Sequence, residues 1–394
     1  MKNDISFLVG LKNNLTYTIF FYDNVRKVYP DIELVFVSYG STDGTNEWLD
    51  QLEDENVQYF YSHETKTLSD TYNKATLIAT KKNVCFLHND MVLGQKFVEN
   101  LMQGLEENHI TCYKVVEPPI FTEDNRDWKI VEDYGDGIDT FKEKAFVEFE
   151  KKYISDCEIS QSFTNHTSFF LCIERDSLLK IGGLDSLFNP MFYEDDDLIL
   201  RLKLLGFKTK LIHNALVYHF VSKTSRFSLD YQEKTKEIEV KSCRNFYRKW
   251  GFSNSSKANT RYDIGIVLNK GSKDSLNYLE PFASVIYIDF PMDDYINEEQ
   301  INTKYDLKTR IKSISEMKQH DVMVYIEGNK MNNKTKNNIA NLSEIISDNK
   351  KSFLNPNFLV KLFYKIFKPN KPLVFYKVPE RKEKLLIYKE LEVC

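Results

Sequence analysis

Residues 32–45 read IELVFVSYGSTDGT, and this stretch gives the clearest indication of the fold. Its apolar first part has the length of a buried strand, and the run breaks at the turn 40–45. A helical pattern follows at 46–52. Another apolar run lies earlier, at 5–11, and a helical segment at 18–28 connects the two runs. Apolar strands that alternate with helices are typical of an α/β protein with a mostly parallel sheet and helices on both faces.

The alternation of strands and helices continues along the chain. Further elements are predicted as strands at 57–61, 84–87 and 169–173, a short strand pair at 211–212 and 215–219, and helices at 68–79 and 229–250. Residues 117–156 differ, because they are acidic and contain two adjacent prolines. This composition predicts that the segment is an excursion that leaves the sheet and forms a loop, which is followed by a charged helix at 140–153. Ligands of such sheets bind beyond the carboxyl ends of the strands, so the site is expected there.

A second domain is predicted after residue 258. The segment SNSSK at 253–257 has the composition of a linker, and the strand pattern then starts again. Strands are expected at 263–268, 284–289 and 321–326, with a helix at 334–346. The length of 394 residues suits two domains. We therefore expect a first domain at 1–252 and a smaller α/β domain at 259–394, to which the sequence assigns no role.

Composition limits the class of protein and its partners. The hydrophobic content of 42% and the charged content of 28% are those of a soluble globular chain. The net charge of -5 argues against nucleic acid as a partner. The six cysteines form no Cys-x-x-Cys motif, which suits a reducing compartment, and the first residues lead straight into a strand rather than a signal peptide. We therefore expect a cytoplasmic location.

Residues 358–367 allow two interpretations. Their apolar side chains lie on one helical face and lysines lie elsewhere, as in helices that rest on a membrane surface. The same stripe suits packing onto the second domain, which is the more common use of such a face. Peripheral membrane contact through 358–367 therefore stays open, and the sequence does not determine the oligomeric state.

Three polar motifs follow predicted strands or open predicted helices. The stretch FYEDDDLILRL at 192–202 places four acids at the start of an amphipathic helix, and IGGLD at 181–185 precedes it. His88-Asn89-Asp90 follows the predicted strand at 84–87, and His219 ends another strand. Taken alone, the acids could simply cap a helix, whose dipole favours them. Together the motifs offer a candidate general base and the oxygen and imidazole ligands of a divalent cation.

The turn 40–45 resembles the strand-end nucleotide loop of the family 2 glycosyltransferases, which have the GT-A fold. His88-Asn89-Asp90 stands where that family carries its Asp-x-Asp metal motif, and 181–201 is similar to its acceptor-side block. The resemblance covers about residues 1–250. It implies a GT-A nucleotide-diphospho-sugar transferase domain that moves a sugar from its donor to a hydroxyl of a glycan or glycoconjugate, with inversion. It also implies a divalent metal, Mn or Mg.

The resemblance also implies roles for particular residues. Asp195 takes the place of the catalytic base, with Glu194 as its nearest rival, and Asp197 and Gly183 lie on the acceptor side. The metal ligands are Asp90 and His219. The nucleotide-sugar site is expected to include Leu11, Lys12, Ser38, Gly40, Asn73, His88 and Asn89. A basic loop with Lys223 and Arg226 follows His219 and could neutralise the leaving diphosphate.

Two positions depart from the family pattern and leave alternatives open. Ser38 stands where the family usually has an acid that binds the nucleotide base, and His88 replaces the first acid of the metal motif. A retaining transferase of the same fold would share the metal site without needing Asp195. A sugar-1-phosphate nucleotidyltransferase is disfavoured, because Lys12-Asn13-Asn14 replaces a glycine- and arginine-rich loop. A catalytically inactive carbohydrate- or nucleotide-sugar-binding protein also stays open.

Overall fold

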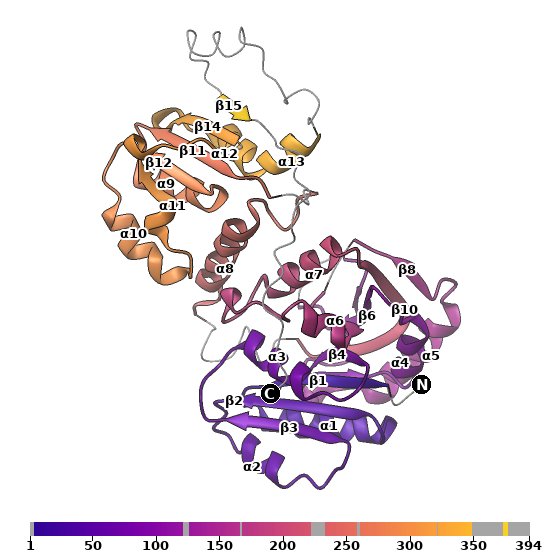
Figure 1. The fold of residues 1–394 in the computed structure, drawn as a ribbon. Helices are drawn as coiled ribbons and strands as arrows, with labels where there is room; N and C mark the ends of the chain where they lie inside the picture. The colour runs from indigo at the N-terminus through magenta and orange to yellow at the C-terminus, as the bar shows by residue number, and fades with distance from the viewer. Residues whose placement is uncertain are drawn as a thin grey trace. The chain divides into compact units, whose positions relative to one another are not determined.

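The computed structural model describes residues 4–120, 126–165, 168–221, 233–257, 261–320, 322–348 and 373–376. The chain divides into two compact units, one from Met1 to Ile238 and the other from Glu239 to Lys384 (Figure 1). The division falls inside helix α8 (Thr235–Trp250). The boundary between 252 and 259 stays a prediction from the sequence.

The first unit is built on one mixed sheet with the strand order β3-β2-β1-β4-β9-β6-β10-β5, to which β7 and β8 are added. Its strands are β1 (Ile5–Leu11), β2 (Glu33–Tyr39), β3 (Val57–Ser62), β4 (Asn83–His88), β5 (Met91–Leu93), β6 (His109–Glu117), β7 (Lys129–Val131), β8 (Gln161–Phe163), β9 (Leu171–Glu174) and β10 (Lys208–His219). Strands β1 to β4 pair in parallel, as do β6 and β10, whereas β5 and β9 run antiparallel to their neighbours. The predicted α/β class with a mostly parallel sheet is confirmed.

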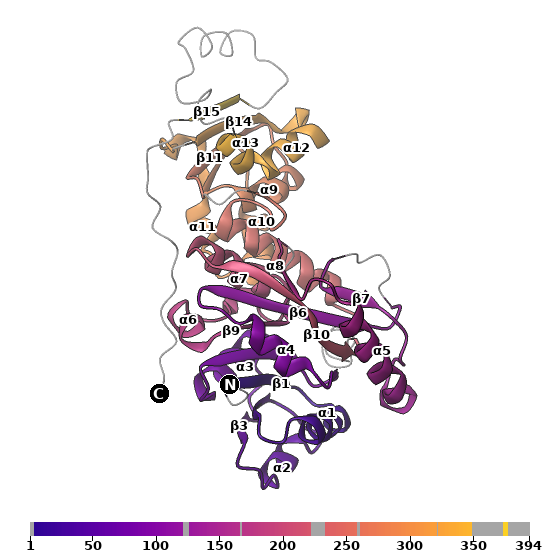
Figure 2. The ribbon, with the colours of Figure 1, turned by 90° about the vertical axis from the view of Figure 1, so that its right-hand side faces the viewer.

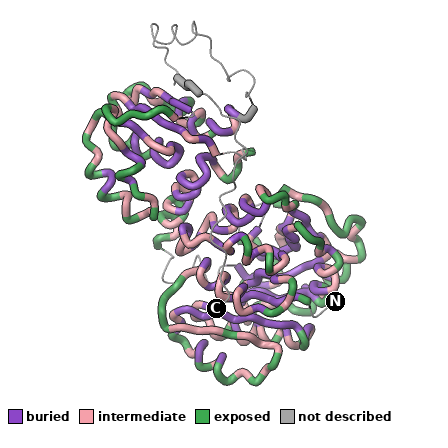
Figure 3. The backbone as a smooth tube through the Cα atoms, in the orientation of Figure 1, coloured by how far each residue is buried: buried purple, intermediate pink, exposed green. Residues whose placement is uncertain are grey.

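Helices pack against this sheet (Figure 2). They are α1 (Leu15–Val28), α2 (Thr45–Asp50), α3 (Leu68–Ile78), α4 (Phe97–Gly104), α5 (Glu143–Asp156), α6 (Arg175–Lys180) and α7 (Glu194–Leu204). Helix α3 contacts β1 and β2, and α4 contacts β10. All seven residues of β2 are buried, including the polar Glu33 and Ser38, as expected for a parallel strand covered on both faces. Of its two neighbours, β1 is buried at all residues but one, whereas the edge strand β3 is mostly half-buried (Figure 3).

Two predictions for this unit were wrong in detail. Residues 211–212 and 215–219 are not a strand pair but parts of the single strand β10, whose register against β6 shifts between Ile212 and Leu216. In the sequence, the polar residues 213–214 indicate a break between two strands. A bulge-like irregularity instead lets one strand continue through them in the same direction. Strand β6 itself, at 109–117, was not predicted. The charged helix after the excursion begins at Glu143, because residues 138–140 form a separate 3-10 turn.

The second unit is a smaller α/β body with the strand order β13-β12-β11-β14-β15. Its elements are β11 (Ile264–Asn269), α9 (Lys273–Leu279), β12 (Val285–Ile288), α10 (Asp293–Glu299), α11 (Leu307–Arg310), β13 (Ile311–Ser313), β14 (Val322–Glu327), α12 (Asn333–Ala340), α13 (Leu342–Asp348) and β15 (Leu373–Tyr376). The three predicted strands correspond to β11, β12 and β14. The single helix predicted at 334–346 is divided into α12 and α13 at Asn341.

A buried ion network holds α8 to the body of the second unit. The Glu280 carboxylate is fully buried and lies 2.7 Å from Arg248 Nη2 and 2.8 Å from Arg310 Nε. Burial alone would raise the pKa of Glu280, but the two guanidinium groups outweigh burial and lower this pKa to about 2. The network therefore makes α8 an integral part of the second core.

None of the helices in the described part of the chain combines the length and the apolar character needed to cross a bilayer.

Candidate active site

The turns that follow β1 and β2 interlock at the carboxyl ends of these strands. Lys12 Nζ donates to the carbonyl oxygen of Gly40 at 2.8 Å, and the backbone N–H of Asn13 donates to Ser41 Oγ at 2.9 Å. Gly40 has a φ of 65°, and a Cβ atom there would lie 2.9 Å from Thr65 Oγ1. Glycine at this position thus permits both the left-handed turn and the close approach of the neighbouring segment.

Ser38 lies at the base of this loop, opposite Leu11 in the β1–β2 register. Its side chain is fully buried, and its hydroxyl lies 2.8 Å from both Ser41 Oγ and Asn46 Oδ1. The Ser38 hydroxyl therefore shapes the loop from inside. Leu11 is also buried, with 2% of its surface exposed.

A pocket lies beside these strand ends and brings several predicted residues together. It is lined by Gly10, Leu11, Lys12, Tyr39, Lys66, Thr67, Leu68, Thr71, Tyr72, His88, Pro190 and Met191. The lining thus combines the ends of β1, β2 and β4 with the start of α3 and the residues just before α7. Among these lining residues Lys12 and Lys66 carry the positive charges, and the Lys66 ammonium lies 5.1 Å from the centre of the Tyr39 ring.

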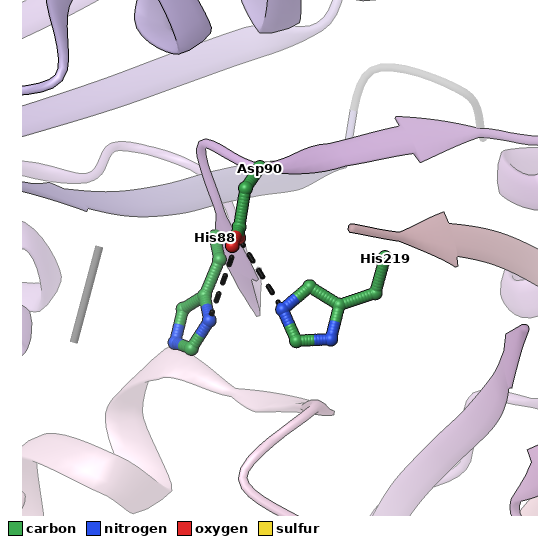
Figure 4. A group of neighbouring side chains, drawn as sticks. All are labelled: His88, Asp90 and His219. Carbon is green, nitrogen blue, oxygen red and sulfur yellow. Dashed lines mark ion pairs between the residues drawn. The ribbon is translucent and has the colours of Figure 1, made fainter. Parts of the chain in front are cut away.

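His88, Asp90 and His219 form a cluster next to this pocket (Figure 4). His88 Nδ1 lies 3.9 Å from Asp90 Oδ1, and His219 Nε2 lies 3.3 Å from the same oxygen. The three donor atoms all lie within 4.8 Å of one another. The pairing of β5 with β10 creates this proximity, because it places His219 opposite Met91, and the N–H of Phe220 donates to the Asp90 carbonyl at 3.0 Å.

Each histidine of the cluster has a distinct environment. His88 is packed among the rings of Phe169, Phe170 and Tyr72, and burial lowers its pKa to about 4, so its imidazole is neutral at pH 7. Burial alone would lower the pKa of His219 as well. The carboxylates on both sides of its ring, Asp90 and Glu117, outweigh burial and raise this pKa to about 9.

Glu117, at the end of β6, is a residue that the sequence analysis missed. Its Oε1 lies 2.9 Å from His219 Nδ1, and its Oε2 lies 2.9 Å from Lys129 Nζ. The sequence did contain a signal for this residue, because 110–117 has the pattern of a strand and ends on an acid. The strand at 84–87 is likewise followed by the polar residues His88, Asn89 and Asp90. Without β6 in the predicted sheet, this acid could not be placed beside His219.

The cluster fits a divalent cation. Ligand atoms about 2.1 Å from one ion lie roughly 3–4 Å apart, which agrees with the separations of 3.3 and 3.9 Å. The three side chains are mostly buried, and the side chain of Asp90 is fully buried. The Nδ1 of His219 already faces a carboxylate, so its Nε2 is the nitrogen directed at the cluster. Such a carboxylate partner is the usual companion of a ligating imidazole.

The four acids at the start of α7 differ in how far they are buried. Asp197 is fully buried and accepts from Arg201 Nε at 2.8 Å, and 5% of Glu194 is exposed. Asp195 and Asp196 are partly exposed, and Asp195 Oδ1 accepts from the backbone N–H of Asp196 at 2.9 Å. Tyr193, the residue before the helix, has a φ of 68°, which a bulky side chain rarely adopts.

The glycine loop before α7 is held from two sides. Asn73 of α3 donates from Nδ2 to the Leu184 carbonyl and accepts from the Leu184 N–H at Oδ1, both at 2.8 Å. Arg201 Nη2 donates to the carbonyl of Gly183 at 2.6 Å. Through these bonds the glycine loop is tied both to α3 and to α7. Asn89 is fully buried and donates to Thr18 Oγ1 at 2.9 Å.

Two predictions lie outside the described residues. These are the basic loop with Lys223 and Arg226, and the amphipathic stretch 358–367.

The family model of glycosyl transferase family 2 matches residues 6–172. No curated protein matches the sequence. The match includes the turn 40–45 and His88-Asn89-Asp90, whereas α7 and His219 lie beyond its end.

Several solved structures are similar to this chain at low identity. The mannosyltransferase PcManGT from Pyrobaculum calidifontis, in complex with GDP-Man and Mn²⁺, is 16% identical with a TM-score of 0.42, and the match covers 62% of this chain and 63% of that one. GalNAc-T7 with UDP, GalNAc and Mn²⁺ is 13% identical with a TM-score of 0.47, over 64% of this chain and 49% of that one. TarS 1-349 of S. aureus is 13% identical with a TM-score of 0.41, over 62% of each chain.

The chain covers less than two thirds of each of these structures. The family match and the strand order of the first unit agree with the resemblance found in the sequence. Residues 6–172 are thus similar to the glycosyl transferase family 2, and they lie within the α/β unit whose mostly parallel sheet was expected from that resemblance.

Proposed function

We propose that this protein is a metal-dependent glycosyltransferase that moves a sugar from a nucleotide-diphosphate donor to a hydroxyl of a glycan or glycoconjugate, with inversion. One observation carries the proposal. His88 lines the pocket at the strand ends and also belongs to the cluster with Asp90 and His219. A donor in this pocket would therefore place its diphosphate beside the cation ligands, where the charge of the leaving group develops.

His88, Asp90 and His219 would hold the cation. When bound, it would supply positive charge that stabilises the departing nucleoside diphosphate. Mg²⁺ prefers shells made of oxygen atoms, and two of these three ligands are imidazoles. We therefore propose Mn²⁺ ahead of Mg²⁺.

The lysines of the pocket would bind the donor phosphates from the side away from the cluster. Lys12 is held by the Gly40 carbonyl, so its ammonium is already positioned over the loop. Lys66 begins the segment that leads into α3 and is partly exposed, with 43% of its side chain accessible. Contacts from these lysines to phosphate would be the same for every nucleotide base. Ser38, at the position where an acid could bind the base, is buried beneath the loop. The donor site therefore lacks an acid at the Ser38 position to select uracil.

Asp195 is the proposed base. It is one of two partly exposed acids in the run, so an acceptor hydroxyl can reach it, and it opens a helix that begins three residues after the pocket-lining Met191. In this role the carboxylate removes the proton of the acceptor hydroxyl as the oxygen attacks the anomeric carbon. Glu194 is its rival, although Glu194 is more deeply buried. The acceptor, a cytoplasmic location and membrane contact through 358–367 stay predictions.

The test is a screen for nucleotide release. The purified full chain is incubated with UDP-, GDP- and dTDP-sugars, with Mn²⁺, Mg²⁺ or chelator, with and without simple glycan acceptors. Release that requires metal supports the proposal, and the anomeric configuration of a transferred sugar separates inversion from retention. Donor binding without release under any of these conditions would favour the alternative of an inactive nucleotide-sugar-binding protein.

A further inference from the structure

A chain of buried polar side chains extends from the metal cluster to strand β7. His219 lies between two acids, with Nε2 3.3 Å from Asp90 Oδ1 and Nδ1 2.9 Å from Glu117 Oε1. The other oxygen of Glu117, Oε2, lies 2.9 Å from Lys129 Nζ. The exposed fractions of the Glu117 and Lys129 side chains are only 8% and 2%. Interactions between charged groups are strong in such a water-poor interior, and the removal of one member leaves its partner unsatisfied.

We infer that Glu117 and Lys129 are a positioning pair for His219. Glu117 accepts the N–H of His219 Nδ1 and thereby fixes the ring with Nε2 directed toward Asp90. Lys129 balances the charge of Glu117, so that a carboxylate can be kept in this buried place. A carboxylate that accepts from the second nitrogen of a ligating imidazole fixes its tautomer and raises its basicity. The inference rests on the proposed function, because it concerns the cation site of that function.

Tyr218, the residue before His219, is hydrogen-bonded to the excursion that follows β6, the segment to which Lys129 also belongs. The backbone N–H of Tyr134 donates to Tyr218 Oη at 3.1 Å, and Tyr218 Oη donates to the carbonyl of Gly135 at 2.6 Å. Lys129, Tyr134 and Gly135 all belong to the excursion after β6, and β7 within it pairs in parallel with β6. The excursion thus fixes the last two residues of β10, and with them one ligand of the cluster.

A purely structural role for Glu117 makes a different prediction, and the chain contains a control for it. Glu150 of α5 is another buried carboxylate of the first unit, and it accepts from the backbone N–H groups of Gln95 and Lys96 at 2.8 and 3.0 Å. It is not part of the cluster of His88, Asp90 and His219. If burial of a carboxylate were all that mattered, substitution of Glu150 and of Glu117 would have similar effects.

The experiment measures Mn²⁺ affinity by calorimetry for the full-length wild type, Glu117→Ala, Glu117→Gln and Glu150→Gln. We expect Glu117→Ala to bind about 10- to 100-fold more weakly than the wild type. Glu117→Gln keeps an oxygen acceptor, so its loss should be smaller but measurable, and Glu150→Gln should match the wild type. Wild-type affinity in Glu117→Gln, or an equal loss in Glu150→Gln, would overturn the inference.

A metal-free readout accompanies the calorimetry. In protein with ¹⁵N-labelled histidine, we expect the Nδ1–H proton of His219 to be protected from exchange in the wild type and in Glu150→Gln, and exposed in Glu117→Ala. Equal protection in Glu117→Ala would contradict the positioning role even if metal binding changed. Failure of the wild type to bind either Mn²⁺ or Mg²⁺ is a separate outcome, because it would refute the proposed metal-dependent function and the inference together.

Discussion

Arg201 and Asp197 form a buried ion pair one helical turn apart in α7, with Nε and Oδ2 separated by 2.8 Å. Arg201 also donates to the carbonyls of Ile181 and Gly183 at 2.8 and 2.6 Å. One side chain thus joins the acidic helix to the glycine loop in front of it. Asp197 is fully buried in this pair, whereas Asp195 and Asp196 are the partly exposed acids among the four. An acceptor-side role for Asp197 stays a prediction.

The first prediction separates the acids of α7. Asp195→Asn keeps the shape of the side chain but cannot accept the acceptor proton, so kcat should fall by about 10²–10⁴-fold while donor affinity barely changes. Asp196→Asn is the matched control, because Asp196 is adjacent and also partly exposed, and its kcat should be nearly normal. Glu194→Gln should be milder than Asp195→Asn. Steady-state kinetics with donor-binding isotherms measure both quantities.

The opposite order would locate the base elsewhere. Near-normal turnover in Asp195→Asn, together with a large loss in Glu194→Gln, would move the base by one residue. If neither substitution changes turnover, the acids only start a helix, and the inverting mechanism is wrong.

The second prediction concerns the nucleotide base. Ser38 is buried and its hydroxyl lies within hydrogen-bond distance of Ser41 and Asn46, so it brings no charge to the donor pocket. We expect UDP, GDP and dTDP to inhibit nucleotide release with similar potency. Ser38→Asp should favour UDP if the loop tolerates the larger side chain. Inhibition by UDP far stronger than by the other two, in the wild type, would show that other groups select uracil.

The third prediction is a pH dependence of the second unit. The pKa of Glu280 is lowered from 4.5 to about 2 in the folded chain, so the stabilisation from its ion pairs is complete above about pH 4.5 and is lost as the pH falls toward 2. At neutral pH, Glu280→Gln should reduce the free energy of unfolding of this unit by about 3–5 kcal/mol, because it removes the buried carboxylate that pairs with Arg310 and leaves Arg248 with Glu299 as its remaining acid. The difference between variant and wild type should shrink below pH 4.5.

Denaturant unfolding followed by tryptophan fluorescence measures this difference. The chain has three tryptophans, and Trp250 lies at the end of α8, so replacing Trp48 and Trp128 with Phe in both proteins leaves a reporter for the second unit. A difference that stays constant from pH 7 to pH 3 would show that the Glu280 charge does not stabilise the unit.

The sequence predicted the central strands and the ends at which the site lies, because buried parallel strands carry a continuous apolar pattern. It also predicted Asp90 and His219 as ligands of one metal, and the structure places their side chains 3.3 Å apart. Glu117 and β6 could not be placed, because their pairing with β10 joins segments about 100 residues apart. The bond between Asp197 and Arg201 was missed for a different reason. An acid at a helix start looks exposed in the sequence, and its burial depends on tertiary packing.

In the proposed function, the cluster of His88, Asp90 and His219 couples a bound cation to the sugar donor. The most direct measurement is donor affinity and nucleotide release, with Mn²⁺ and with saturating chelator, for the wild type and for Asp90→Ala, with Asp90→Asn as the variant closest in shape. We expect Mn²⁺ to strengthen donor binding and to permit release in the wild type, and we expect both effects to disappear in Asp90→Ala while circular dichroism shows an unchanged fold. Undiminished turnover of the wild type in saturating chelator would contradict it.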